Sequence, residues 1–226
     1  MLGTLVMPSI LGMNAAMAMV TMSQLLTADR EDGTLLRVKA TPNGMLSYLV
    51  GKIISVSGVL VADLAIFLVP AMFIIPGLAV GSLGSWLTLI WVLALGLVAT
   101  LPIGAVLGSV FTSVRSQGFL TLPILGMIAI SGVFYPITVM PGWVQGIAQV
   151  FPIYWLGLGM RSALLPDDAV SVELGESWRH LETIGVLGAW TVLGLIVAPI
   201  VLRRMARRES GSSVAERREK ALQRVG

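Results

Sequence analysis

Two features of this sequence have residue types that can do chemistry: the pair Gly51-Lys52, and a single acid, Asp63, within a long apolar run. A phosphate-binding loop of the Walker A type needs two glycines separated by four residues, followed by lysine and a hydroxyl residue. Here six residues separate Gly44 from Gly51, and Ile53 stands where the hydroxyl is needed. We therefore expect no ATP to bind at this segment.

Catalysis inside a membrane would need paired aspartates, a serine with a histidine, or a metal site with histidine ligands. Asp63 is the one acid within the apolar spans, the single histidine, His180, lies in a polar loop, and the chain has no cysteine. Ser131 matches a serine-protease pattern only loosely, because Ala129 replaces the glycine. We expect a chain that is not an enzyme and holds no metal ion or cofactor.

The composition is that of an integral membrane protein. Of its 226 residues 56% are hydrophobic and 12% are charged, whereas a soluble domain carries about 25% charged residues. Between Ile53 and Pro166 the charged side chains are Asp63, Arg115 and Arg161. Most of the net charge of +3 comes from the end of the chain, so we read it as a signal of orientation and expect no nucleic-acid partner.

A helix of about 20 apolar residues crosses about 30 Å of hydrocarbon, and five runs are long enough. They predict an all-α polytopic membrane protein with one transmembrane domain, residues 1–202, and a basic cytoplasmic tail, residues 203–226, that lies against lipid headgroups. The predicted spans are 1–26, 53–75, 83–111, 119–137 and 184–202.

Lysine and arginine in short loops predict which side of the membrane each loop occupies. With five alternating spans, one side receives Arg30, Arg37, Lys39, Lys52, Arg115, Arg203, Arg204, Arg207 and Arg208. We predict a multi-pass protein of the plasma membrane with a cytoplasmic C-terminus, which leaves Met1 outside. We therefore expect a further helix ahead of Met1, encoded upstream or supplied by another chain, unless the chain is an inserted remnant.

The segment between the first two spans predicts a short helix on the membrane surface. Asp29 is a suitable N-cap, and Thr41-Pro42 ends the helix. Its apolar residues can face lipid or protein, while its charged residues, Arg30, Glu31, Asp32 and Arg37, stay accessible to a soluble partner. The alternative is a solvated loop whose basic residues only fix the topology.

The segment before the last span predicts a pair of short helices that re-enter the membrane. Pro136, Pro141 and Pro152 break helices, and Trp143 and Trp155 are suited to the interface. Irregular backbone at membrane depth persists only where protein buries it or where it lines water. The alternative is an ordinary loop with an aromatic belt.

Asp63 lies near the middle of its span, where a charge costs about 2.5–3.5 kcal/mol on insertion scales. It is either a substrate or cation contact, or a protonated or hydrogen-bonded carboxyl at a helix contact. Six of the twelve methionines fall between Met1 and Met22, and flexible thioethers suit varied apolar ligands, although lipid-facing or core methionine is the alternative. We place Asn14, Met17 and Asp63 on a substrate path.

Two longer motifs resemble one known family. EDGTLLRVKATP followed by LVGK, and FYPITVMPGWVQGIAQVFPIYWLGLGMR from Phe134 to Arg161, resemble the intracellular-loop signature and the segment before the last span of type-2 ABC transporter permeases (ABC-2 family). Together they cover the chain from about Met1 to Leu202. The resemblance is closest to the multidrug and antibiotic-resistance permeases.

The resemblance implies a transmembrane subunit of an ATP-driven exporter of hydrophobic drugs or lipid-like molecules. The subunit would pair with a second copy or a homologue, and each would rest on a separate ATP-binding subunit that holds ATP and Mg. The helix around Glu31, Gly33, Thr34 and Leu35 would be the coupling helix, and the segment with Pro136, Pro141, Pro152 and Arg161 would re-enter the membrane. Family members normally have six spans, so the first would be absent here. The alternative is a self-contained secondary carrier or channel, or a membrane scaffold.

Overall fold

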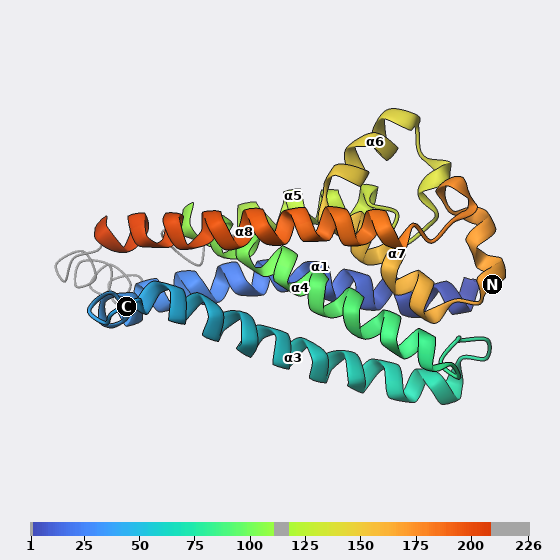
Figure 1. Cartoon of the computed structure of the whole chain (residues 1–226), viewed down its shortest axis with the longest axis horizontal. Coiled ribbons are helices and arrows are strands. Elements are labelled where there is room, and N and C mark those ends of the chain that lie inside the picture. Colours follow the sequence, from blue (N-terminus) through green and yellow to red (C-terminus); the bar gives the residue numbers. More distant parts are fainter. Residues whose placement is uncertain (1, 111–117, 209–226) are drawn as a thin grey trace, which may run out of the picture.

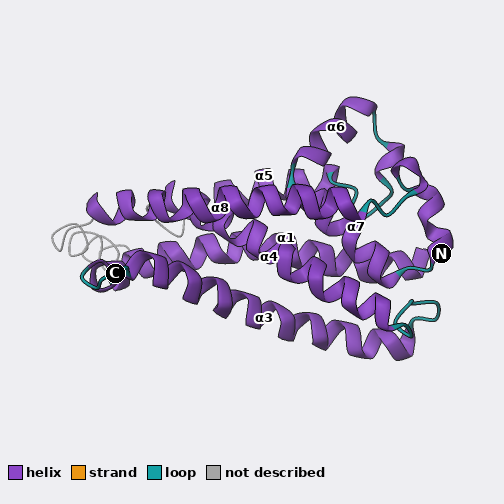
Figure 2. Cartoon of the chain, viewed as in Figure 1, coloured by secondary structure: helices purple, strands orange, loops and turns teal. Residues whose placement is uncertain are grey.

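The computed structural model describes residues 2–110 and 118–208, and within these ranges every regular element is a helix (Figures 1 and 2). In chain order the elements are α1 (Leu2–Glu31), α2 (Thr34–Lys39), α3 (Gly44–Ile74), α4 (Leu83–Val110), α5 (Gly118–Ile130), η2 (Ile137–Val139), α6 (Gly142–Val150), α7 (Pro152–Leu164), η3 (Asp167–Val172), η4 (Leu174–Glu176) and α8 (His180–Arg208). The all-α membrane architecture expected from the sequence is confirmed.

Four of the described helices, α1, α3, α4 and α8, are long and apolar enough to cross a membrane. In the fourth predicted span, 119–137, the structure has α5, whose 13 residues rise only about 20 Å. The helix ends there because Gly132 takes a left-handed φ of 69°, which reverses the chain ahead of Pro136. The described residues therefore contain four full-length spans rather than five.

Helix α4 is the centre of the bundle and packs against α1, α7 and α8. Gly104 and Gly108 of α4 lie directly on the backbone of α1: a Cβ built on Gly104 would come within 2.9 Å of the Met19 Cα, and one on Gly108 within 2.8 Å of the Ser23 Cα. Glycines at this spacing allow two helices to approach closely within a membrane. Gly104 and Gly108 therefore form a close contact between α4 and α1.

Helix α3 is attached differently. Most of its side chains are exposed, and the buried ones form a single row: Met45, Leu49, Ile53, Val56, Leu60, Leu64, Leu68 and Ala71. The intervals of three and four residues place this row on one helix face. In Figure 1 the helix runs along one side of the bundle, and it is packed mainly against α1.

The two ends of the bundle carry different structures (Figure 1). At one end α2 joins α1 to α3 and lies next to the last turns of α8. At the other end residues 131–179, which we call the helical cap, gather α6, α7 and the short 3-10 helices beside the N-terminal part of α1. The predicted basic segment between α1 and α3 and the last turns of α8 therefore lie at the same end of the bundle. Arg115, assigned to the same side from the sequence, lies outside the described residues.

Candidate functional site

The three residues predicted to lie on a substrate path, Asn14, Met17 and Asp63, line one cavity between α1 and α3, with a volume of about 360 Å³. We call it the α1–α3 cavity. Asn14 and Met17 come from the middle of α1, and Asp63 comes from the middle of α3. The remaining wall is mixed, with hydroxyls and apolar groups contributed by Ala18, Thr21, Leu25, Ser55, Val56, Val59, Leu60 and Phe67.

The Asp63 carboxylate is exposed and makes no hydrogen bond or ion pair within the described part of the chain. A charged group at this depth is costly unless water, protein or a ligand solvates it. The hydrogen-bonded carboxyl at a helix contact, weighed from the sequence, has no partner among the described residues. What the cavity offers instead is one acid next to an amide and two hydroxyls, with Phe67 and Met17 as apolar surface.

The residues predicted to contact a soluble partner lie where α1 passes into α2, and we call residues 29–37 the α1–α2 junction. Gly33, with a φ of 82°, separates the two helices, and the Asp32 carboxylate accepts the Thr34 N–H at 2.8 Å. Leu35 is buried at 1% exposure and fixes α2 to the bundle, whereas Asp32 and Arg37 are exposed. Arg37 also donates to the Thr34 hydroxyl at 3.2 Å.

Three of the other predicted residues of the junction are half-buried: Arg30, Glu31 and Thr34. Arg30 donates to the Ser109 carbonyl of α4 at 3.5 Å, so its guanidinium points back to the bundle. The predicted N-cap at Asp29 is wrong, because α1 continues unbroken to Glu31. The break falls at Asp32 and Gly33 instead.

Asp29 instead contacts two residues of α3, which the sequence did not predict. Its carboxylate lies 2.7 Å from the Lys52 Nζ and accepts the Tyr48 hydroxyl at 2.6 Å. This group joins the end of α1 to the beginning of α3. The motif with Gly51 and Lys52 that resembles a phosphate loop is therefore part of a helix, and its lysine serves as the partner of an aspartate.

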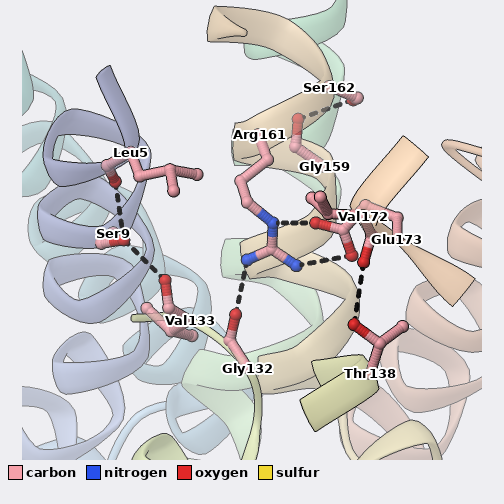
Figure 3. Close-up of polar contacts among 10 residues, drawn as sticks. All are labelled: Leu5, Ser9, Gly132, Val133, Thr138, Gly159, Arg161, Ser162, Val172 and Glu173. Carbon is pink, nitrogen blue, oxygen red and sulfur yellow. Dashed lines mark hydrogen bonds and ion pairs between the residues drawn. The ribbon is translucent and has the colours of Figure 1, made fainter. Parts of the chain in front are cut away.

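Arg161, predicted from the proline-rich segment, is 2% exposed and is the centre of the helical cap (Figure 3). Its Nε and Nη2 donate to the Glu173 carboxylate at 2.6 and 3.3 Å, and its Nη1 donates to the Gly132 carbonyl at 2.7 Å. Ser9 of α1 donates to the neighbouring Val133 carbonyl at 2.7 Å. One arginine thus connects α7 to two loops, one of which is bonded to α1.

The three prolines of this segment each stand at the start of a helix. Pro136 precedes η2, Pro141 precedes α6, and Pro152 is the first residue of α7, positions that tolerate the missing N–H. Apart from Ser162, all of α7 is buried. Within it, burial raises the pKa of the Tyr154 phenol, and the nearby Glu173 carboxylate raises it further.

Sequence reasoning missed Glu173, because a buried acid in an exposed-looking run of acidic residues has no local signal. The one indication of Glu173 in the sequence was the isolated Arg161, because a buried arginine needs an acidic partner. Ser131 and His180, which were rejected as catalytic residues on the sequence, make other contacts. Ser131 donates to the Ile128 carbonyl at 2.7 Å, and His180 lies edge-on to the Trp91 ring, with the two ring centroids 6.0 Å apart.

Four long apolar helices with a polar cavity at mid-length define a polytopic membrane protein. The chain matches the family described as ABC-2 family transporter protein over residues 2–200, and it belongs to that family. Its members are membrane transport subunits that normally work with an ATP-binding subunit and are not themselves ATPases. The resemblance found from the two sequence motifs is confirmed. No curated protein and no solved structure matches the chain.

Proposed function

We propose that the chain is the transmembrane subunit of an ATP-driven exporter, and that hydrophobic drugs or lipid-like molecules pass through the α1–α3 cavity. The observation that carries this proposal is the convergence of Asn14, Met17 and Asp63 on one cavity midway along two spans. A transport subunit needs polar side chains at membrane depth to contact its substrate. Few residues of these spans have such side chains. Phe67 and Met17 would contact the apolar part of the substrate.

The energy for transport would come from a separate subunit that binds ATP and Mg. The α1–α2 junction suits a docking surface, because Leu35 fixes it to the bundle while Asp32 and Arg37 are exposed. The basic residues at the same end support a cytoplasmic position for α2 and for the C-terminus. Two such chains, or this chain and a homologue, would form the complete exporter in the plasma membrane.

Docking is tested by tagging the C-terminus, purifying the chain from its native membrane in mild detergent, and identifying co-purifying proteins by mass spectrometry. We expect an ATP-binding subunit, and we expect Arg37→Glu to reduce its recovery. The matched control is Glu176→Lys, which reverses an exposed charge at the opposite end of the bundle. If Arg37→Glu and Glu176→Lys reduced recovery of the ATP-binding subunit equally, docking at the junction would be contradicted. It would also be contradicted if no ATP-binding subunit co-purified.

The path is tested by Asp63→Asn, which removes the charge and keeps the shape. Hydrogen bonds to charged groups are worth about 1.5–3 kcal/mol, so we expect export of cationic hydrophobic dyes to fall by about tenfold or more. Ala62→Asn places the same amide on the neighbouring exposed position of α3, which does not line the cavity, and should leave export unchanged. Unchanged export of every dye by Asp63→Asn, at equal protein in the membrane, would remove Asp63 from the path.

A further inference from the structure

A second cavity, of about 310 Å³, lies at the α2 end of the bundle, between the turn from α2 to α3 and the last turns of α8. We call it the α2–α8 cavity. Its charged lining consists of Lys39, Arg203 and Arg207, and Thr41, Asn43 and Met45 complete much of the wall. None of its lining residues is acidic. Three cations from two distant segments therefore surround one hollow.

The turn on one side of this cavity is closely fixed. Gly44 begins α3 directly against the Val38 carbonyl, where a Cβ has no room, and its N–H donates to the Thr41 carbonyl at 3.1 Å. The N–H groups of Leu46 and Ser47 donate to the Asn43 carbonyl.

Of the first four amides of α3, that of Met45 has no backbone acceptor within the described ranges. An unpaired amide at the N-terminus of a long helix favours a bound anion.

The other side is formed by α8, on which Arg203 and Arg207 are four residues apart and therefore share a face. Both are exposed, and neither side chain makes an ion pair or hydrogen bond within residues 2–110 and 118–208. Between them lie Met205 and Ala206, which are buried in the bundle core. Like charges at this spacing repel each other, so an anion held between them and Lys39 would remove a cost already present in the fold.

We propose that the α2–α8 cavity binds the phosphate of an anionic phospholipid. A lipid is favoured over free phosphate because exposed apolar residues lie close in sequence to the lining residues on both helices: Leu46 and Val50 on α3, and Ile200 on α8, are each more than 40% exposed. These residues would contact the acyl chains while the basic residues hold the headgroup at the end of the spans. In the proposed orientation the lipid belongs to the cytoplasmic leaflet.

This site differs from the predicted contact of the basic tail with lipid, because Lys39 and the amide of Met45 come from α2 and α3. It would place a lipid headgroup directly beside the α1–α2 junction, so that membrane composition would influence how α2 is held. Binding itself needs neither the ATP-binding subunit nor a substrate. Its failure is therefore distinguishable from failure of the proposed function.

The experiment titrates the full chain, purified in a neutral detergent, with dioleoylphosphatidylglycerol or dioleoylphosphatidylcholine and counts bound lipids by native mass spectrometry. We expect phosphatidylglycerol to bind more tightly, and Arg203→Gln and Arg207→Gln each to weaken it about fivefold, since a basic residue near an anionic surface is worth about 1 kcal/mol. Arg204→Gln is the matched control, because Arg204 is exposed on the same helix but does not line the cavity. Lys39→Gln tests the site from α2 and does not alter α8.

Three results would overturn the proposal. Equal affinity for the two lipids would mean that the anion is not recognised, and equal weakening by Arg204→Gln and Arg207→Gln would mean that charge at this end acts without a specific site. Displacement of phosphatidylglycerol by inorganic phosphate at equal concentration would mean that the cavity takes free phosphate and that the apolar residues beside it contribute nothing. Retention of phosphatidylglycerol against excess phosphate supports the lipid.

Discussion

Helices α3 and α4 are similar in length and composition, yet the bundle holds them in different ways. Helix α4 is covered by α1, α7 and α8, and its glycines lie on the backbone of α1. Helix α3 buries one row of side chains and exposes the rest. Apolar residues gain nothing by leaving lipid for protein, so helices in a membrane associate through close packing and polar contacts. By that measure α4 is fixed and α3 is held lightly.

Polar contacts hold the segment of α3 at two places, and the cavity lies between them. At one end Lys52 and Tyr48 bind Asp29 of α1. Beyond the other end, the Ala79 N–H donates to the Leu164 carbonyl of α7 at 2.9 Å. Between these points lies the α1–α3 cavity. Because only one row of α3 side chains, which includes Val56 and Leu60, packs against the bundle here, we infer that a ligand can enter without unfolding the bundle around α4.

The largest expected effect is at Arg161, which belongs to α7, one of the helices that cover α4. Replacing it by methionine leaves Glu173 buried, at 3% exposure, without its partner, and breaking a buried ion pair costs about 3–5 kcal/mol. We expect Arg161→Met to lower the free energy of unfolding by that amount, measured by denaturant unfolding in detergent. Glu176→Gln, which neutralises an exposed acid of the same cap, is the control.

The same pair offers a sharper test in the double variant Arg161→Met with Glu173→Met. Replacing both partners of a buried pair by apolar residues is often neutral or stabilising, so the double variant should recover most of the loss. Failure to recover would mean that the hydrogen bond from Arg161 to Gly132, at 2.7 Å, rather than the ion pair, fixes the cap.

The second test enlarges the contact between α4 and α1. A methyl group at Gly104 meets the backbone of Met19, which cannot move aside as a flexible side chain would. Overpacking of this kind costs about 1–3 kcal/mol, so Gly104→Ala should unfold at lower denaturant concentration. Unchanged stability would show that α4 and α1 are free to separate, and the contrast between α3 and α4 would be lost.

A smaller effect is expected at the group that attaches α3 to α1. The side chains of Lys52 and Asp29 are 23% and 15% exposed, and partly exposed ion pairs are worth at most about 1 kcal/mol. We expect Lys52→Met to destabilise the chain by less than that, with Tyr48→Phe testing the hydrogen bond separately. A loss as large as that of Arg161→Met would show that the end of α3 is held as firmly as the cap.

The long helices could be predicted from the sequence because the backbone of an uncharged run of spanning length must form its hydrogen bonds within the segment, as a helix, when it lies in lipid. Their ends were harder to predict. The second span was predicted from residue 53, and the helix that contains it, α3, begins earlier, at Gly44, so that Lys52 lies within the helix and pairs with Asp29. The first span was expected to end at residue 26, and α1 continues to Glu31.

Of the candidate sites, the sequence indicated the individual residues and not their partners. Asp63 was singled out by the cost of a lone charge in an apolar run, and Arg161 by its place in the proline-rich motif that resembles the ABC-2 family. Glu173 and Asp29 could not be paired with Arg161 and Lys52, because each pairing depends on how helices and loops meet in three dimensions. The α2–α8 cavity also depends on how the helices assemble, since Lys39 was interpreted only as a signal of orientation and Arg207 as part of a tail lying against lipid headgroups.

The smallest expected effect has the opposite sign and completes the comparison. Gly58 lies on the exposed side of α3, and a Cβ built there meets nothing within 4 Å. Alanine is favoured over glycine within a helix by about 1 kcal/mol or less, so Gly58→Ala should raise the free energy of unfolding slightly, whereas Gly104→Ala lowers it. The two variants make the same chemical change in two spans. If Gly58→Ala were as destabilising as Gly104→Ala, this face of α3 would be packed against protein, and the helix would not be the lightly held element that we infer.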